Sequence, residues 1–155
     1  MESKSLRVLE LDKILERLAS YCAFGASADL ARDLAPATAS EEVTRRLAET
    51  SEARALLDQH PQVGIRGARD IRPQIESAHR GAVLGPVDLL DIRATLISAR
   101  LLRRTISRLE STFPRLAFLA GSLSEFPTLV DDISRIVNDR GEIVDDASAE
   151  LARIR

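Results

Sequence analysis

The feature that most constrains the fold of this chain is one long apolar pattern between residues 85 and 109. Gly85-Pro86 precedes it, and proline is favoured at the first position of a helix because it lacks an amide hydrogen that would be unpaired there. Two adjacent apolar stripes then recur at helical spacing, which predicts a long helix that packs on several neighbours. The first stripe comprises Leu89, Ile92, Leu96, Ala99, Leu102, Ile106 and Leu109, and the second comprises Leu90, Ala94, Ile97 and Leu101.

Shorter helices are expected on both sides, at about 12–21, 27–34, 38–57, 70–80, 116–123 and 127–137, with another beginning near residue 146. Asp12, Ser27 and Asp70 are expected to cap helix starts, and Thr38 and Glu41 to form a capping box. Gly81 is expected to end the helix before it. The alternation of Val63 with Ile65 allows one short strand, and Ile143-Val144 a brief extended piece. The pattern therefore predicts an all-α fold with at most a trace of β structure.

Size and composition favour one helical region covering residues 1–155. Aromatic residues make up only 3% of the chain, so the core must consist of aliphatic side chains. The net charge of −2 does not indicate a nucleic-acid-binding protein. Cys22 is the only cysteine, which fits a reducing compartment. The sequence shows no apolar signal core and no uncharged run near the roughly 20 residues of a membrane helix. A cytoplasmic protein without membrane contact is expected.

Few residues suggest chemistry. No phosphate-binding G-x-x-x-x-G-K-[ST] loop occurs, and no Cys/His set suits zinc. His60 and His79 fall at expected helix ends, where a histidine usually contacts terminal carbonyls. The acidic residues between Asp131 and Asp146 can bind a divalent cation through oxygen, but a solvated turn with helix capping explains them better. We therefore predict no catalytic residue, no metal ligand and no cofactor site in this chain.

One candidate binding site is a row of arginines on the long helix. Arg93, Arg100, Arg104 and Arg108 fall in one sector because they are separated by seven, four and four residues. Such a row can follow a phosphate backbone. The favoured alternative is an outer face paired with carboxylates of neighbouring helices, because the chain carries no basic excess.

The pattern near residue 155 predicts a helix that has begun and has no stop signal, which favours a piece of a longer protein. Several strings, in order along the whole chain, resemble one family, the bacterial MutS-two proteins, which are MutS paralogues with a C-terminal Smr endonuclease domain. They are residues 6–15, Glu-Thr-Ser-Glu-Ala at 49–53, Asp-Ile-Arg-Pro at 70–73, residues 83–92, and residues 141–148 with Leu151 and Ile154-Arg155. The departures are small: Gly85 stands where the family usually has a capping serine, and Val87-Asp88 where it has two glutamates.

The resemblance implies the N-terminal part of the helical core and lever of a MutS-like protein. The family's ATP/Mg²⁺ site and nuclease would lie C-terminal to this part. The whole protein would form a homodimer and act on branched DNA, suppressing homologous recombination, or on collided ribosomes. No catalytic residue of either activity can be placed on this chain.

Two other interpretations remain open from the residues. A free-standing helical adapter would carry an exposed apolar groove and a complete C-terminus. A small enzyme would use the acidic residues of 131–146 to bind a metal ion.

Overall fold

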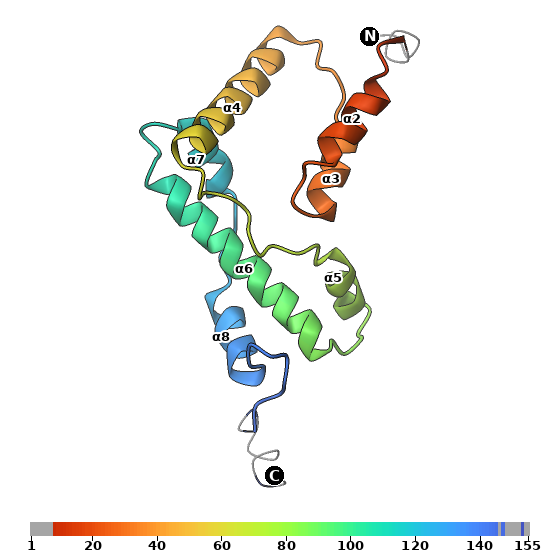
Figure 1. Cartoon of the computed structure of the whole chain (residues 1–155). Coiled ribbons are helices and arrows are strands. Elements are labelled where there is room, and N and C mark those ends of the chain that lie inside the picture. The colour runs from red at the N-terminus through yellow and green to blue at the C-terminus, as the bar shows by residue number, and fades with distance from the viewer. Residues whose placement is uncertain (1–7, 146, 148–152, 154–155) are drawn as a thin grey trace. The chain divides into compact units, whose positions relative to one another are not determined.

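The structure is a computed structural model, and it describes residues 8–145, 147 and 153. The described part is almost entirely helical (Figure 1). Its only β structure is an isolated antiparallel bridge between Val137 and Ile143. The prediction of an all-α fold with a trace of β structure is therefore confirmed. The seven α-helices of the described residues are α2 (Leu11–Ala19), α3 (Gly25–Arg32), α4 (Ser40–Gln59), α5 (Arg72–His79), α6 (Pro86–Ser107), α7 (Pro114–Gly121) and α8 (Pro127–Ile136).

The chain divides into two compact units. The first unit consists of Met1–Gly64 and Thr105–Ala120, and the second of Ile65–Arg104 and Gly121–Arg155. Helix α6 contributes residues to both units, whereas each of the other helices lies wholly, or all but one residue, in one of them.

Helix α6 begins where the sequence predicts. Pro86 is its first residue, and the Asp88 carboxylate accepts a hydrogen bond of 3.0 Å from the backbone N–H of Gly85. The first apolar stripe is buried or half-buried along its whole length, with Ile92 and Ile106 deepest. The second stripe is not covered throughout, because Ile97 is 46% and Leu101 64% exposed. The expectation that both stripes pack inside the protein was therefore wrong for Ile97 and Leu101 of the second stripe.

Three of the predicted helix starts are displaced. Helix α2 is preceded by Glu10 in the left-handed region (φ 51°), so Asp12 lies in the first turn and is not the cap. There its carboxylate still faces the positive end of the helix dipole. Helix α3 begins at Gly25, which places Ser27 inside it, where its hydroxyl donates a hydrogen bond of 2.8 Å to the Phe24 carbonyl.

Helix α4 also lacks the expected capping box. Its cap position is Ala39, which has no side-chain acceptor, so Thr38 and Glu41 cannot form the reciprocal pair. The helix is long enough, at 20 residues, to form without this local contribution.

The ends of α5 follow the sequence more closely. Asp70 lies one residue before the cap position, and its carboxylate accepts a 3.3 Å hydrogen bond from the backbone N–H of Arg72. Gly81 adopts φ 82°, and its N–H binds the Ala78 carbonyl, while the next N–H binds the Ser77 carbonyl. This paired arrangement ends the helix in a Schellman motif, as the glycine predicts.

In the first unit, α2 and α3 pack on each other, and two small residues, Ala19 and Ala31, are buried there. Phe113, just before α7, is 2% exposed and meets the His60 ring edge-to-face, with centroids 6.3 Å apart. Glu52 of α4 joins the start of α7, as described below.

In the second unit, side chains of α6 hold the segment that precedes α5. The Ser98 hydroxyl donates a hydrogen bond of 3.0 Å to the Arg66 carbonyl, and the Thr95 hydroxyl accepts one of 2.8 Å from the N–H of Arg69. Residues 62–69 form no strand, so the short strand that the alternation of Val63 with Ile65 allowed is absent.

A tight hairpin follows α8. The bridge between Val137 and Ile143 is framed by hydrogen bonds of 3.0 Å from the Asn138 N–H to the Glu142 carbonyl and from the Val144 N–H to the Ile136 carbonyl. The brief extended piece expected at Ile143-Val144 is therefore confirmed. The turn needs a positive φ, 77° at Gly141, which a glycine adopts without strain.

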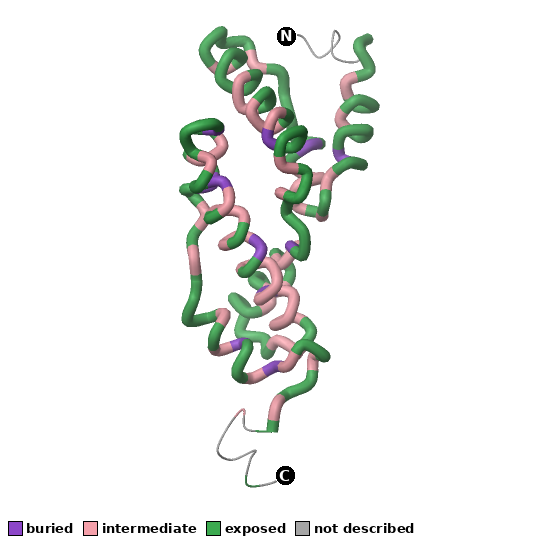
Figure 2. The backbone as a smooth tube through the Cα atoms, turned by 60° about the vertical axis from the view of Figure 1, so that its left-hand side comes forward, coloured by how far each residue is buried: buried purple, intermediate pink, exposed green. Residues whose placement is uncertain are grey.

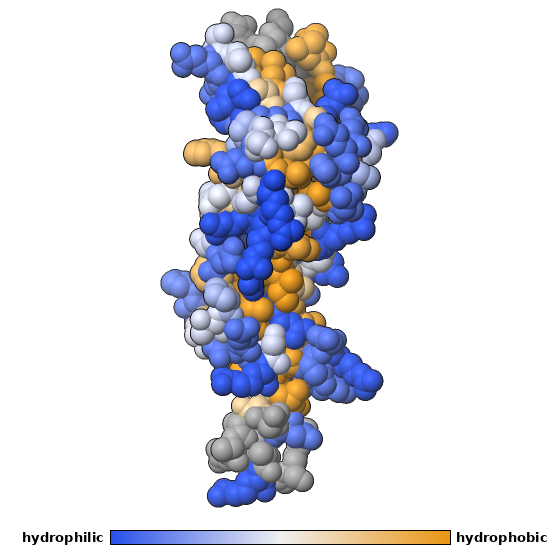
Figure 3. Space-filling view, turned by 90° about the vertical axis from the view of Figure 1, so that its left-hand side faces the viewer, coloured by the Kyte–Doolittle hydropathy of each residue, from blue (hydrophilic) through white to orange (hydrophobic). Residues whose placement is uncertain are grey.

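Burial is sparse throughout the described residues (Figure 2). Among the described residues, ten apolar ones form the buried core, whereas 21 large hydrophobic ones are exposed. Apolar surface is accordingly visible among the hydrophilic surface in Figure 3. None of the described helices combines the length and hydropathy needed to cross a bilayer.

Candidate nucleic-acid interface

Arg93, the first arginine of the predicted row, is used inside the second unit. Its side chain is only 14% exposed. One guanidinium nitrogen donates a hydrogen bond of 3.3 Å to the carbonyl of Val137, and the other binds the Asp139 carboxylate at 2.5 Å. Because Val137 is completely buried, this contact supplies a partner to a carbonyl that sits in the core. Arg93 therefore fastens the 137–143 hairpin to α6.

Arg100 is also engaged within the second unit. Its Nε lies 3.5 Å from a carboxylate oxygen of Glu125, in the segment between α7 and α8. Arg103, a neighbour outside the predicted row, lies 3.7 Å from the other Glu125 oxygen and donates a 2.9 Å hydrogen bond to the Leu123 carbonyl. One carboxylate thus lies close to two arginines. This agrees with the alternative interpretation of the row as an outer face paired with carboxylates of neighbouring segments.

Arg104 and Arg108 differ from the other two. Both are exposed, and neither forms an ion pair with any residue that the structure describes. Arg104 lies within α6, whereas Arg108 follows the last residue of the helix. Their guanidinium groups are available to an anionic ligand without breaking an internal contact. Nucleic-acid binding by the four arginines stays a prediction, and these two are the members best placed for it.

The acidic stretch forms a turn held by its own side chains. The Asn138 side-chain oxygen accepts hydrogen bonds of 2.9 and 3.0 Å from the N–H groups of Arg140 and Glu142. Within the described residues, no three histidine, cysteine or acidic side chains are close enough to hold a metal ion. Asp146, near which the last helix is expected to begin, lies outside the described residues.

The two histidines show no catalytic partner in the described part of the chain. His60 caps α4 at its C-terminal end and packs its ring on Phe113. His79 is the last residue of α5 and is exposed. Cys22 is half-buried, and its thiol lies 3.4 Å from the Ser27 carbonyl, which it can reach as a weak donor.

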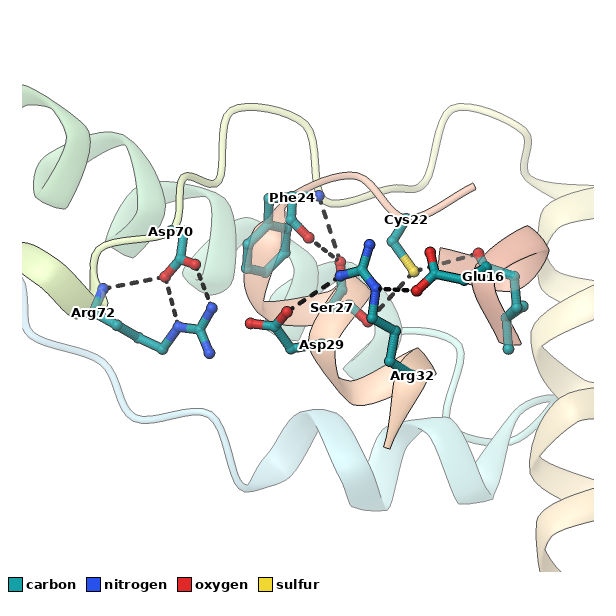
Figure 4. A network of polar contacts seen from close by, with 9 residues as sticks. Glu16, Cys22, Phe24, Ser27, Asp29, Arg32, Asp70 and Arg72 are labelled. Atoms are coloured by element: carbon teal, nitrogen blue, oxygen red, sulfur yellow. Dashed lines mark hydrogen bonds and ion pairs between the residues drawn. The ribbon is translucent and has the colours of Figure 1, made fainter. Parts of the chain in front are cut away.

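Figure 4 shows two exposed groups of ion-paired residues, one in each unit. In the first unit, a hydrogen bond of 2.9 Å to the Glu16 carboxylate, with a smaller contribution from Asp29, raises the pKa of Arg32. In the second unit, the Arg72 guanidinium donates two hydrogen bonds, of 2.8 and 2.5 Å, to the two Asp70 oxygens and lowers the pKa of that carboxyl group.

Sequence reasoning missed the role of Glu52, a carboxylate that binds the start of α7. Its side chain is 13% exposed, and its Oε2 accepts hydrogen bonds of 2.9 and 3.1 Å from the backbone N–H groups of Arg115 and Leu116. Its Oε1 binds the Arg115 guanidinium at 3.0 Å. A carboxylate at a helix N-terminus satisfies unpaired N–H groups and the helix dipole together. No local pattern reveals this role, because the partners lie more than 60 residues away.

The comparisons with known proteins agree with the predicted resemblance. No protein-family model matches the chain. The chain is 39% identical over 158 residues to endonuclease MutS2 of Thermomicrobium roseum, covering 100% of this chain and 20% of that protein. It is 41% identical over 155 residues to endonuclease MutS2 of Symbiobacterium thermophilum, and 37% identical over 158 residues to that of Geobacillus thermodenitrificans. In both, the whole chain is covered, together with 19% and 20% of the respective relative.

The chain thus spans about a fifth of the length of the curated relatives it matches. The matched portion is the N-terminal one. The predicted resemblance to MutS-two proteins is confirmed: the whole chain matches the N-terminal region of endonuclease MutS2 proteins.

Proposed function

We propose that this chain is a structural, non-catalytic core and lever segment of a MutS2-like ATPase and endonuclease. The observation that carries the proposal is the match of the entire chain to one fifth of the relatives, all of them named as endonucleases. The whole protein would bind ATP and Mg²⁺ outside these residues, act as a homodimer, and work on branched DNA or on collided ribosomes.

Helix α6 supports the lever part of this proposal. It runs without a break for 22 residues and belongs to both units. A continuous helix moves as a rigid element, so it suits the transmission of a nucleotide-driven change to a distant clamp. Within the second unit, Arg93, Thr95 and Ser98 bind segments outside the helix, so those segments would follow it.

A test of the lever weakens α6 at exposed positions of the full-length protein. Replacing both Ile97 and Leu101, which are exposed and lie outside the arginine row, by glycine should cost about 1 kcal/mol of helix stability at each position relative to alanine. We expect basal ATP hydrolysis to persist and its response to branched DNA or ribosomes to be lost. The matched control replaces the same two residues by alanine, which removes the side chains and keeps the helix stiff. A glycine variant whose response equals that of the alanine control would refute the lever.

The adapter interpretation is the second candidate, and the exposed apolar side chains favour it. The two interpretations differ in whether the native protein continues past residue 155. If the native reading frame continues past residue 155 into a G-x-x-x-x-G-K-[ST] loop, the segment interpretation stands. If the frame stops at Arg155, the core and lever proposal fails and the adapter becomes the better account.

A further inference from the structure

The second unit carries an apolar groove that none of the described residues covers. Its volume is about 380 Å³. Helices α5, α6 and α8 form its walls and floor, and every lining side chain is apolar. The lining includes Ile75, Ile92, Leu96, Phe126, Leu129 and Ile133.

The rim of this groove is the exposed part. Ile75 of α5 is 56% exposed, and Phe126 and Leu129, at the start of α8, are 51% and 44% exposed. The floor, by contrast, includes the buried Ile92 and Ile133. Large apolar side chains that converge around a concave surface and stay in water are typical of an interaction site.

The chemistry of the lining selects the kind of occupant. Small-molecule sites combine apolar walls with a few polar groups that orient the ligand, and this groove has none. The lining residues recur at helical spacing, for example Phe126, the residue that caps α8, followed by Leu129 and Ile133 within it. Ridges of this spacing accept the apolar face of another helix, whose large side chains repeat every three or four residues.

We propose that this groove receives the apolar face of a helix from the same polypeptide, C-terminal to residue 155. The inference rests on the proposed function, since it requires the longer protein. The relatives have about four-fifths of their length outside the matched region. A segment tethered to the same chain reaches the groove at an effective concentration of about millimolar, which favours it over a separate partner.

The first experiment measures side-chain exposure in the full-length protein by hydroxyl-radical footprinting with mass spectrometry. We expect Phe126 and Leu129 to be oxidised at least about tenfold more slowly than Val83, which is 98% exposed and outside the groove. Oxidation of Phe126 and Leu129 at the rate of half-exposed side chains would overturn the proposal.

A matched pair of variants then tests whether the groove itself causes the protection. Leu129→Glu in the full-length protein places a charge on the rim and should restore the oxidation of Phe126. Val83→Glu, on an exposed position away from the groove, should leave it unchanged. Equal effects of the two substitutions, or no effect of Leu129→Glu, would count against a docked helix.

The occupant is identified by a photo-reactive benzoylphenylalanine at position 129, with ¹⁵N-labelled and unlabelled protein mixed in equal amounts. Cross-links within one isotopic species to a segment beyond residue 155 support the proposal. Mixed-isotope cross-links would assign the groove to a second copy, and cross-links to no segment would show it empty; both overturn the proposal. If the protein still hydrolyses ATP and responds to DNA while the groove is empty, this inference fails and the proposed function survives.

Discussion

Replacing Arg93 by methionine should loosen the 137–143 hairpin from helix α6. Methionine keeps an apolar stem of similar length and removes the guanidinium group. The side chain of Arg93 is 14% exposed, so its charge is largely removed from water. Its two contacts differ in their exposure. The contact to Val137 involves a buried carbonyl, whereas the Asp139 side chain is 95% exposed.

The expected loss of stability follows from the difference between the two contacts of Arg93. A hydrogen bond from a charged donor contributes about 1.5–3 kcal/mol, and its loss leaves the Val137 carbonyl without that donor. An ion pair with an exposed carboxylate contributes only about 0–1 kcal/mol. We therefore expect Arg93→Met to lower the free energy of unfolding by about 2–3 kcal/mol and Asp139→Ala by less than about 1 kcal/mol.

The assay is urea unfolding followed by far-ultraviolet circular dichroism, with the double variant completing a mutant cycle. Arg104→Met is the control, because Arg104 is exposed on the same helix and has no ion-pair partner among the described residues; it should change stability by no more than about 0.5 kcal/mol. If Arg93→Met costs no more than Asp139→Ala, the buried carbonyl contact does not stabilise the hairpin. Arg93 would then be available for a ligand, as the sequence pattern suggested.

Four further predictions test other parts of the structure. Phe113→Ala should lower the free energy of unfolding by about 3–5 kcal/mol, because the side chain is buried. A loss below about 1 kcal/mol in a urea titration would show that this side chain is not part of the core. Glu52→Ala should cost about 2–4 kcal/mol and Glu52→Gln less, because the amide oxygen still accepts a hydrogen bond from the start of α7; equal costs would contradict this. Arg104→Glu combined with Arg108→Glu should weaken binding of branched DNA by the full-length protein and lower its salt slope by about 2, whereas unchanged fluorescence anisotropy titrations would exclude both residues. The pKa of Asp70 is lowered in the folded state, so its contribution to stability is present above the unfolded pKa of about 3.9 and is lost as the pH falls through the folded pKa. Asp70→Asn should therefore reduce the loss of stability at acid pH. An unchanged dependence of stability on acid pH would refute this.

The sequence predicted those elements that depend on residues close together in the chain. Gly85-Pro86 marked the start of α6, and Gly81 the end of α5, because a proline at a helix start and a glycine at a helix end act within one turn. The apolar periodicity and the lack of strand patterns indicated the all-α class. The order of the motifs indicated a resemblance to MutS-two proteins, which the comparisons confirm.

The helix caps show where local reasoning was insufficient. Several residues near a helix start can each satisfy the same N–H groups, so Asp12 and Thr38 had competitors that the pattern does not rank. The structure starts α2 after Glu10 and α4 after Ala39, without a side-chain cap in either case.

The candidate interface depended still more on tertiary structure. The sequence placed Arg93 and Arg100 in one row with Arg104, because helical spacing alone decides which residues share a sector. Only the fold shows that Arg93 reaches the hairpin 44 and 46 residues away and that Arg100 pairs with Glu125, while Arg104 stays unpaired among the described residues. A side chain's spacing along its own helix is a local property, but its partner is set by which segments pack beside that helix. For this reason the sequence determined the helical class and the resemblance to MutS-two proteins, and only the tertiary structure decided which charges and apolar faces remain available for binding.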